Sequence, residues 1–352
     1  MAPAESGGGA PPRRALIVGA GGFSRGWART LQDSARVTVA GWVDIRPGAA
    51  EQAARELELA GIHTGTDLEK ALSSVGPDFV LDVVAPAAHH EVAVQALEAG
   101  LPVLCEKPMA DSMEHARAMI AAADRAGKLL MISQQRTYNR GFGAMRRLIV
   151  EQLGPPAILN SDFYIAHPEA GFHQPMPDPL LLDMAIHTFD AARFVSGADP
   201  VAVYCEEFNA PWSWFSGLAS ATALFEMTGG LHYTYLGSWT SQGRHTTWES
   251  EWRAVGPNGT LTWDGESPPV AEIVTVPGEF PHSGRPLGLT RVEGMLDPSA
   301  PQWLEAPLRD FLRALDTGST PWGECHDNIK SLAMVFGAIE SARTGTRVSI
   351  EP

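Results

Sequence analysis

The chain has 352 residues, of which 41 are acidic and 26 basic, so its formal charge is −15, and 44% of its residues are hydrophobic. That hydrophobic fraction supports packed cores and excludes a globally disordered chain. The length predicts two domains, because single cores stop growing at about 250–300 residues. The acidic balance argues against nucleic acid or an anionic membrane surface as a partner, since both are polyanions.

The cysteines and the N-terminal residues indicate the compartment. Cys105, Cys205 and Cys325 are far apart and show no metal-binding spacing, so we expect a reducing cytoplasm and no metal site. No apolar run reaches the roughly 20 residues of a membrane helix. Residues 1–12 are rich in Ala, Pro and Gly without an apolar stretch, which predicts a disordered leader rather than a signal peptide.

The first third of the chain alternates apolar strands with helices. Short apolar runs predict strands at residues 14–20, 37–44, 78–85, 102–107 and 129–135. Helical patterns lie between them at residues 24–32, 47–60, 89–99 and 112–126. Continuous apolar strands separated by helices are typical of a parallel, doubly wound sheet covered on both faces. We therefore predict an α/β domain at residues 13–135.

From residue 136 the pattern changes to longer, clustered strands. We predict strands at residues 158–165, 201–208, 221–227, 231–239, 248–255 and 260–263, and helices at 142–152, 180–195, 303–316 and 327–343. Residues 267–301 are rich in Pro and Gly and are expected to form a loop. Strands with few helices between them favour an α+β domain at residues 136–352 with a large, mostly antiparallel open sheet.

A glycine-rich turn follows the first predicted strand. Gly19, Gly21 and Gly22 lie between that strand and the helix that begins near Ser24. Glycines permit a tight turn and a close backbone approach to a pyrophosphate, and a helix N-terminus attracts its charge. The GxGxxG pattern is imperfect, because Ser24 occupies the third glycine position, where it would either cap the helix or loosen its packing.

An acidic residue ends the second predicted strand. Asp44 lies where a carboxylate would accept hydrogen bonds from an adenosine ribose and repel a 2′-phosphate. Together with the turn and the alternation, it predicts a Rossmann domain that binds NAD. Arg46 keeps NADP open as an alternative, because an arginine there can bind a 2′-phosphate.

Two further groups of residues have the chemistry of a redox site. Lys107, in Glu106-Lys107-Pro108, follows a predicted strand at its carboxyl end, where such sheets bind ligands. Asp183 and His187 are four residues apart and share one face of an apolar helix. A structural Asp–His pair is the alternative; a metal site would need more ligands than Asp190 alone supplies.

These motifs, in this order, resemble those of the Gfo/Idh/MocA family of glucose–fructose oxidoreductases and inositol dehydrogenases. The resemblance rests on the glycine-rich turn, Asp44, Ala85-Pro86 followed by His89-His90, Glu106-Lys107-Pro108, and the sequence LLDMAIHTFDAARF at residues 181–194. It extends over residues 13–350. Ser24 and Ala85, where threonine is common, depart from the family pattern.

The resemblance implies roles for individual residues. Lys107 would contact the nicotinamide ribose and the substrate hydroxyl, His187 would be the general acid and base, and Asp183 would hold a neighbouring hydroxyl. The implied cofactor contacts are Gly19, Gly21, Gly22, Phe23, Ser24, Asp44, Ile45, Arg46, Ala85, Pro86, His90, Glu106, Lys107, Gln135 and Arg136. The substrate candidates are Lys107, Arg136, Tyr164, His167, Asp183, His187, Trp239 and Arg244.

Each of these residues also has a purely structural interpretation. Arg136 would form a salt bridge between domains, His167 would occupy an exposed loop position, and the tryptophans would pack a dimer interface. The residue types suit oxidation of a secondary alcohol, because histidine titrates near neutral pH and an ammonium stabilises a developing alkoxide.

We therefore expect an NAD-dependent dehydrogenase that oxidises a ring hydroxyl of a sugar, inositol or related polyol. The alternatives are an NADPH-dependent ketoreductase on an activated sugar and a non-catalytic, nucleotide-sensing regulator of the same fold. The sequence lacks the cysteine and histidine spacing that a zinc-dependent alcohol dehydrogenase needs to bind its metal. The family's second domain often pairs its sheets, so we also expect a homo-oligomer.

Overall fold

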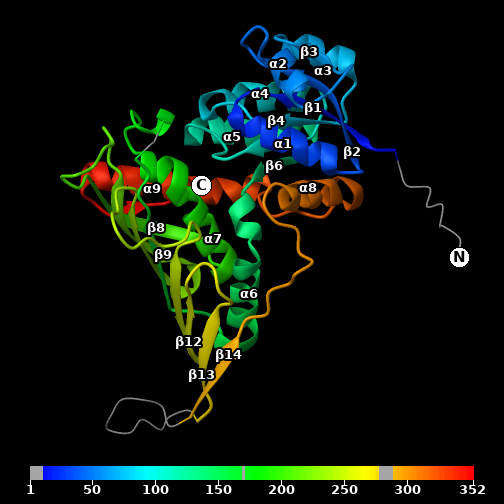
Figure 1. Cartoon of the computed structure of the whole chain (residues 1–352). Coiled ribbons are helices and arrows are strands. Elements are labelled where there is room, and N and C mark those ends of the chain that lie inside the picture. The colour runs from blue at the N-terminus through cyan, green and yellow to red at the C-terminus, as the bar shows by residue number, and fades with distance from the viewer. Residues whose placement is uncertain (1–10, 169–170, 277–287) are drawn as a thin grey trace, which may run out of the picture. The chain divides into compact units, whose positions relative to one another are not determined.

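The computed structural model describes residues 11–168, 171–276 and 288–352 (Figure 1). Residues 1–10 of the expected leader lie outside this part. The chain divides into two compact units: the first comprises residues up to 133 together with 311–325, and the second comprises residues 134–310 and 326–352. Residues 311–325, expected in the second domain, thus belong to the first unit. None of the described helices combines the length and the apolar character needed to cross a membrane.

The first unit contains a six-stranded parallel sheet in the order β3-β2-β1-β4-β5-β6, the doubly wound arrangement that the alternating pattern predicted. Its strands are β1 (Arg13–Val18), β2 (Val37–Val43), β3 (His63–Gly65), β4 (Phe79–Asp82), β5 (Val103–Glu106) and β6 (Leu130–Ser133). Its helices include α1 (Gly22–Asp33), α2 (Ala49–Glu56), α3 (Leu68–Val75), α4 (Pro86–Glu98) and α5 (Met113–Ala126).

Local signals set the ends of these helices. Ser112 accepts a hydrogen bond from the His115 amide at the start of α5, and Gly127 ends the helix in the left-handed conformation. Asp67 caps α3 in the same way through the Lys70 amide. Strand β3 and helix α3 were not predicted, and the connection between them and the start of α3 line the cavity described below.

The second unit contains a nine-stranded sheet in the order β14-β13-β12-β11-β7-β10-β9-β8-β15. Among the strands that the structure describes in this sheet, only β7 and β10 pair in parallel, so the sheet is mixed but mostly antiparallel, as predicted. The strands are β7 (Ile158–Tyr164), β8 (Pro200–Phe208), β9 (Ser220–Met227), β10 (His232–Ser238), β11 (Glu251–Gly256), β12 (Gly259–Trp263), β13 (Val270–Val274), β14 (Leu289–Glu293) and β15 (Val348–Ser349).

The prediction of a loop over residues 267–301 was wrong at β13 and β14, which extend the sheet edge, and residues 277–287 of that prediction lie outside the described residues. The prolines and glycines that suggested a loop flank these strands: Pro268 and Pro269 precede β13, and Gly288 and Gly294 bracket β14. Five-residue strands at a sheet edge give too short a pattern to outweigh such turn signals.

Aromatic packing identifies the inner face of this sheet. Helix α7 (Ile186–Ser196) places Phe189 against Phe225 and Tyr235, with ring centroids 4.9 and 5.2 Å away. Helix α6 (Arg140–Leu148) places Phe142 against Trp252 and Trp263. Side chains alternate along each strand, so the residues between these positions face the other way and form the outer face. The remaining helices are α8 (Glu305–Thr317) and α9 (Cys325–Thr344).

Candidate functional site

The first unit has a cavity of about 760 Å³ beyond the carboxyl ends of its strands. It is lined by the turn after β1, the end of β2 and the start of α4. Ligands of doubly wound sheets bind at this edge, where the strand order reverses. Among the predicted cofactor contacts, the lining includes Gly19, Gly21, Asp44, Ile45, Arg46 and Ala85.

The glycine turn has the backbone form that a pyrophosphate needs. Gly19 has φ +97°, and a Cβ there would lie 2.5 Å from the Val83 carbonyl oxygen, so only glycine fits. A Cβ on Gly21 or Gly22 would meet no atom within 4 Å, which leaves space for a ligand. Gly21 caps α1 without a side chain, so the first amides of the helix face this space uncapped.

Ser24, which occupies the third glycine position of the GxGxxG pattern, does not cap α1. The first of the two interpretations of this residue, a helix cap, was therefore wrong. Ser24 is fully buried, and its hydroxyl donates a 2.7 Å hydrogen bond to the Gly21 carbonyl. The hydroxyl therefore braces the turn and leaves the helix amides available to an anion.

Asp44 is held as a charged acceptor at the end of β2. Its carboxylate accepts hydrogen bonds from the Ala20 amide at 2.6 Å and from the Arg46 side chain at 2.9 Å. Arg46 is the main reason that the pKa of Asp44 falls to about 2, against the opposing effect of burial. The carboxylate is thus ionised at every working pH, as a ribose acceptor must be.

The pocket also includes residues that sequence reasoning missed. The connection from β3 to α3 contributes Thr66, Asp67, Leu68 and Glu69, and helix α4 contributes Glu91 and Gln95. Of the predicted contacts, Phe23 is exposed at the start of α1, and His90 stacks on His115 with ring centroids 4.4 Å apart. Gly22, Phe23, Ser24, Pro86, His90, Glu106 and Lys107 do not line this cavity.

Glu106 and Lys107 lie at the end of β5. The Glu106 carboxylate is buried, accepts a 2.8 Å hydrogen bond from the Trp27 indole, and accepts a second from the Lys107 amide. Burial raises the pKa of Glu106, and these hydrogen bonds oppose that effect. Glu106 therefore fixes the backbone from which Lys107 extends.

Cys105 is a core residue of the first unit. It is fully buried, with its sulfur 3.3 Å from Nδ1 of His89, and His89 in turn pairs with Asp82 at 3.0 Å. Burial raises the pKa of the Cys105 thiol well above its usual range, which makes it a poor nucleophile.

In the second unit, Asp183 and His187 lie on consecutive turns of one helical segment. A π-helical stretch, Leu180–Ala185, carries Asp183 and runs directly into α7, which carries His187. Oδ2 of Asp183 lies 3.0 Å from Nε2 of His173, a loop histidine that sequence reasoning did not single out. His187 is buried, whereas Asp183 keeps about a quarter of its side-chain surface exposed.

Aromatic rings surround His167 and His173. Trp239 lies with its ring centroid 5.6 Å from that of His167 and 5.3 Å from that of His173. Phe215 stacks on Trp239 at 5.8 Å. The predicted candidates His167 and Trp239 are therefore brought together near Asp183, and rings with polar edges of this kind suit a polyhydroxylated ligand.

Arg136 is part of a compact group of side chains within the second unit. Its guanidinium donates a 3.1 Å hydrogen bond to the Trp248 carbonyl, lies 3.5 Å from the Glu249 carboxylate, and sits over the Trp248 ring at 5.3 Å. Burial raises the pKa of Glu249, and Arg136 opposes this. The ion pair of Arg136 is therefore not the salt bridge between domains that was the alternative interpretation. The neighbouring Gln135 is buried.

Family profiles match most of the chain. A profile described as "Oxidoreductase family, NAD-binding Rossmann fold" matches residues 13–134, and the "GFO/IDH/MocA C-terminal domain" matches residues 142–262. The chain belongs to the Gfo/Idh/MocA family. It is an oxidoreductase that binds NAD, and the cavity, the turn and Asp44 fit that cofactor.

Individual Gfo/Idh/MocA relatives are distant but extend over nearly the whole chain. Myo-inositol dehydrogenase Hyg17 of Streptomyces leeuwenhoekii is 27% identical over 86% of this chain and 90% of its own. The 1,5-anhydro-D-fructose reductase of Ensifer adhaerens is 25% identical over 95% and 98%. An Agrobacterium radiobacter oxidoreductase, solved with NAD+, L-tartaric acid and magnesium, has the same fold, with TM-score 0.81 and 21% identity over 96% and 98%.

Two predicted substrate residues belong to the outer face of the sheet. Tyr164 alternates with the inward residue Phe163 and therefore points to the outer face of the sheet, opposite to α7. Arg244 has 87% of its side chain exposed, pairs with Glu251 at 3.1 Å, and lines an outer-face groove with Asn160 and Asp162. The described contacts therefore do not bring Tyr164 and Arg244 together with Asp183.

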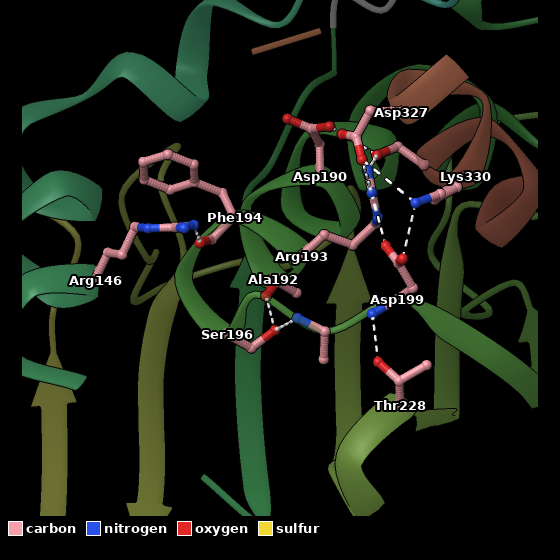
Figure 2. Close-up of polar contacts among 12 residues, drawn as sticks. Arg146, Asp190, Ala192, Arg193, Phe194, Ser196, Asp199, Thr228, Asp327 and Lys330 are labelled. Carbon is pink, nitrogen blue, oxygen red and sulfur yellow. Dashed lines mark hydrogen bonds and ion pairs between the residues drawn. The ribbon is translucent and has the colours of Figure 1, made fainter. Parts of the chain in front are cut away.

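A partly buried polar network holds the part of α7 that follows His187 in the sequence (Figure 2). Arg193 donates to Asp327 at 2.7 Å and to Asp199 at 2.9 Å, and Lys330 also pairs with Asp199 at 2.8 Å. Asp190 accepts hydrogen bonds from the Ser331 and Thr137 hydroxyls. Asp190 and Arg193 follow His187 at three-residue intervals, so this network fixes the helix on which His187 lies.

Proposed function

We propose that the protein is an NAD-dependent dehydrogenase that oxidises a secondary ring hydroxyl of a sugar, inositol or related polyol. The observation that carries this proposal is the Asp183–His187 segment, with His173 on Asp183 and the rings of His167 and Trp239 close by. The names of two relatives, a myo-inositol dehydrogenase and an anhydrofructose reductase, support a substrate of this class.

We assign the chemical roles as follows. His187 takes the proton of the reacting hydroxyl and returns it in the reverse direction, because imidazole titrates near neutral pH. Asp183, oriented by His173, accepts a hydrogen bond from the adjacent hydroxyl. Lys107 binds the reacting oxygen and stabilises the negative charge that develops on it. Bound NAD supplies the hydride acceptor.

The preference for NAD rests on Asp44. Its ionised carboxylate accepts hydrogen bonds from a ribose diol and repels a 2′-phosphate. An NADPH-dependent ketoreductase on an activated sugar is the second candidate, favoured by Arg46, which lines the same cavity and has a largely exposed guanidinium. Turnover with the two cofactors separates them, and a tenfold preference for NADP would overturn our choice.

The test is a screen of cyclitols, aldoses and their lactone or keto products, monitored by NADH absorbance in both directions. With the best substrate, Lys107→Ala and His187→Ala should each lower kcat at least about 100-fold. Lys128→Ala and His232→Ala change exposed residues of the same types and serve as matched controls.

Two results would contradict the proposal. A kcat within threefold of the wild-type value in both Lys107→Ala and His187→Ala would contradict the assigned mechanism. Tight NADH binding without turnover of any compound would favour the nucleotide-sensing regulator.

We further propose a cytoplasmic homo-oligomer, either a dimer or a tetramer. Its support is the outer face of the second unit's sheet, where Ile158, Tyr204 and Leu224 are exposed apolar side chains. Light scattering coupled to size exclusion tests this, and a monomer at micromolar concentration would refute it.

A further inference from the structure

Two exposed tryptophans line one groove of the second unit. Trp303 has 62% of its surface exposed and Trp248 has 42%, and both border a groove of about 490 Å³. Two exposed aromatic side chains that share one groove, unlike a single one elsewhere on the surface, are typical of a ligand-binding surface. The other groove residues are mainly polar: Asn139, Arg140, Gly141, Thr247, Glu249, Gly265, Glu266, Leu296 and Gln302.

The groove adjoins the candidate site through Trp248. On one side the Trp248 ring receives the Arg136 guanidinium, and it lies 6.4 Å from the ring of His167. A small neighbouring hollow is lined by Gln135 and Arg136 together with Trp303. Residues of the predicted substrate and cofactor set are therefore continuous with the groove along one surface.

The segment that carries Trp303 is fixed in place. Arg140 donates hydrogen bonds to the carbonyls of Pro298 at 2.7 Å and Ala300 at 2.9 Å, and Arg147 donates to the Met295 carbonyl. Trp303 itself has φ +51°, a left-handed conformation that bulky residues rarely adopt. Such a conformation persists where the surroundings impose it, often at binding sites. The surroundings therefore hold the Trp303 indole in one position, with a face on which a ligand ring can stack.

The charged side chains of the groove argue against an anionic ligand. Glu249 and Glu266 border the groove, whereas the guanidinium of Arg140 is already bound to backbone carbonyls. A diphosphate would meet two carboxylates there. Amide and carboxylate side chains beside indole rings instead suit a pyranose ring, which has apolar faces and hydroxyl edges.

We propose that this groove is a subsite for a second, uncharged sugar ring, so that the substrate is a glycoside or disaccharide rather than a free monosaccharide or a nucleotide sugar. This inference rests on the proposed polyol dehydrogenase function. In it, Trp303 supplies the platform for the ring that does not react, and the ring to be oxidised lies toward Asp183 and His187.

The binding test uses saturation-transfer NMR with maltose, cellobiose and lactose, each compared with its constituent monosaccharides. It requires neither NAD nor turnover. At least one disaccharide should bind more tightly than its monosaccharides, and Trp303→Ala should weaken that binding at least fivefold, whereas Trp303→Phe should retain most of it. Trp212→Ala removes an equally exposed tryptophan outside the groove and should have no effect.

The kinetic test compares the same variants on the monosaccharide or cyclitol identified by the screen. Trp303→Ala should leave its kcat/KM within twofold. Absence of any disaccharide preference, an equal effect of Trp212→Ala, or a change of oligomeric state in Trp303→Ala would overturn the subsite. None of these outcomes bears on His187 and Lys107, so the groove and the dehydrogenase assignment fail separately.

Discussion

The two units hold their functional groups in different ways. In the first unit, the cofactor pocket depends on backbone: the Gly19 turn, the uncapped start of α1, and Asp44 at the end of a strand. In the second unit, the candidate site depends on side chains distant in sequence, such as Arg136 and Glu249, which are 113 residues apart. The first site should thus be sensitive to backbone changes, and the second to the loss of single side-chain contacts.

The largest effect is expected for Gly19→Ala. The added Cβ would lie 2.5 Å from the Val83 carbonyl oxygen, and the residue would keep a positive φ. We therefore expect the free energy of unfolding to fall by at least about 3 kcal/mol, and NAD binding to be lost. Urea denaturation and NADH fluorescence measure both. Gly22→Ala is the matched control, because its Cβ meets nothing: stability should be kept while NAD affinity falls. Equal stability of the two variants would contradict a backbone-determined site.

The next effect concerns the Asp183–His173 pair. Asp183→Asn removes the charge that faces His173 and should lower kcat/KM about 50-fold, and His173→Gln about fivefold. Because the two side chains are in contact, the double variant should lose less than the product of the single losses. Asp162→Asn, on the outer face, is the control. Strictly multiplicative losses would show that His173 does not orient Asp183.

A smaller effect is expected for the cofactor acid. Asp44→Ala should lower kcat/KM for NAD about tenfold and raise the NADP-to-NAD ratio by at least as much, because the repulsion of a 2′-phosphate disappears. Steady-state kinetics with both cofactors measures this. Asp33→Ala, at the exposed end of α1, should change neither value. An unchanged ratio in Asp44→Ala would mean that other pocket residues set the preference.

The smallest effect is one of stability. Burial, aided by Asp178, raises the pKa of Glu207 to about 8. The folded protein thus holds a proton that the unfolded chain releases near pH 4.5, so stability falls as pH rises from about 5 to 8. Glu207→Gln should raise Tm by a few degrees at pH 8.5 and leave it unchanged at pH 5. Glu206→Gln, the exposed neighbour, is the control; the same Tm shift at both pH values would refute the assignment.

The first unit could be predicted closely because its signals are local. The strand expected at residues 37–44 is β2, Val37–Val43, and Asp44 follows it at the cavity. The missed elements, β3 and α3, are three and eight residues long, too short for a clear periodicity. The cap Asp67 and the terminal Gly76 of α3 were signals that could have revealed the helix.

The second unit was predicted in outline, and the contacts of its candidate site only in part. The Asp183–His187 spacing is a helix signal and was recognised, whereas His173 reaches Asp183 from a loop with no periodic pattern. Alternation along β7 places Tyr164 on the face opposite Phe163, a consequence of the strand pattern that could have been drawn from the sequence. The pairing of Arg136 with Glu249 depends on a tertiary contact that no local pattern specifies.

The interrupted first unit has a consequence for biosynthesis. Phe311 packs on Phe79 with ring centroids 5.2 Å apart, and the Gly323 carbonyl accepts a hydrogen bond from the Ile132 amide. A ribosome that adds roughly 5–20 residues per second needs on the order of 10–40 s to proceed from residue 133 to residue 325. During that interval the emerging nucleotide-binding unit lacks its last segment, and nascent chains with Phe79 uncovered are natural clients for chaperones.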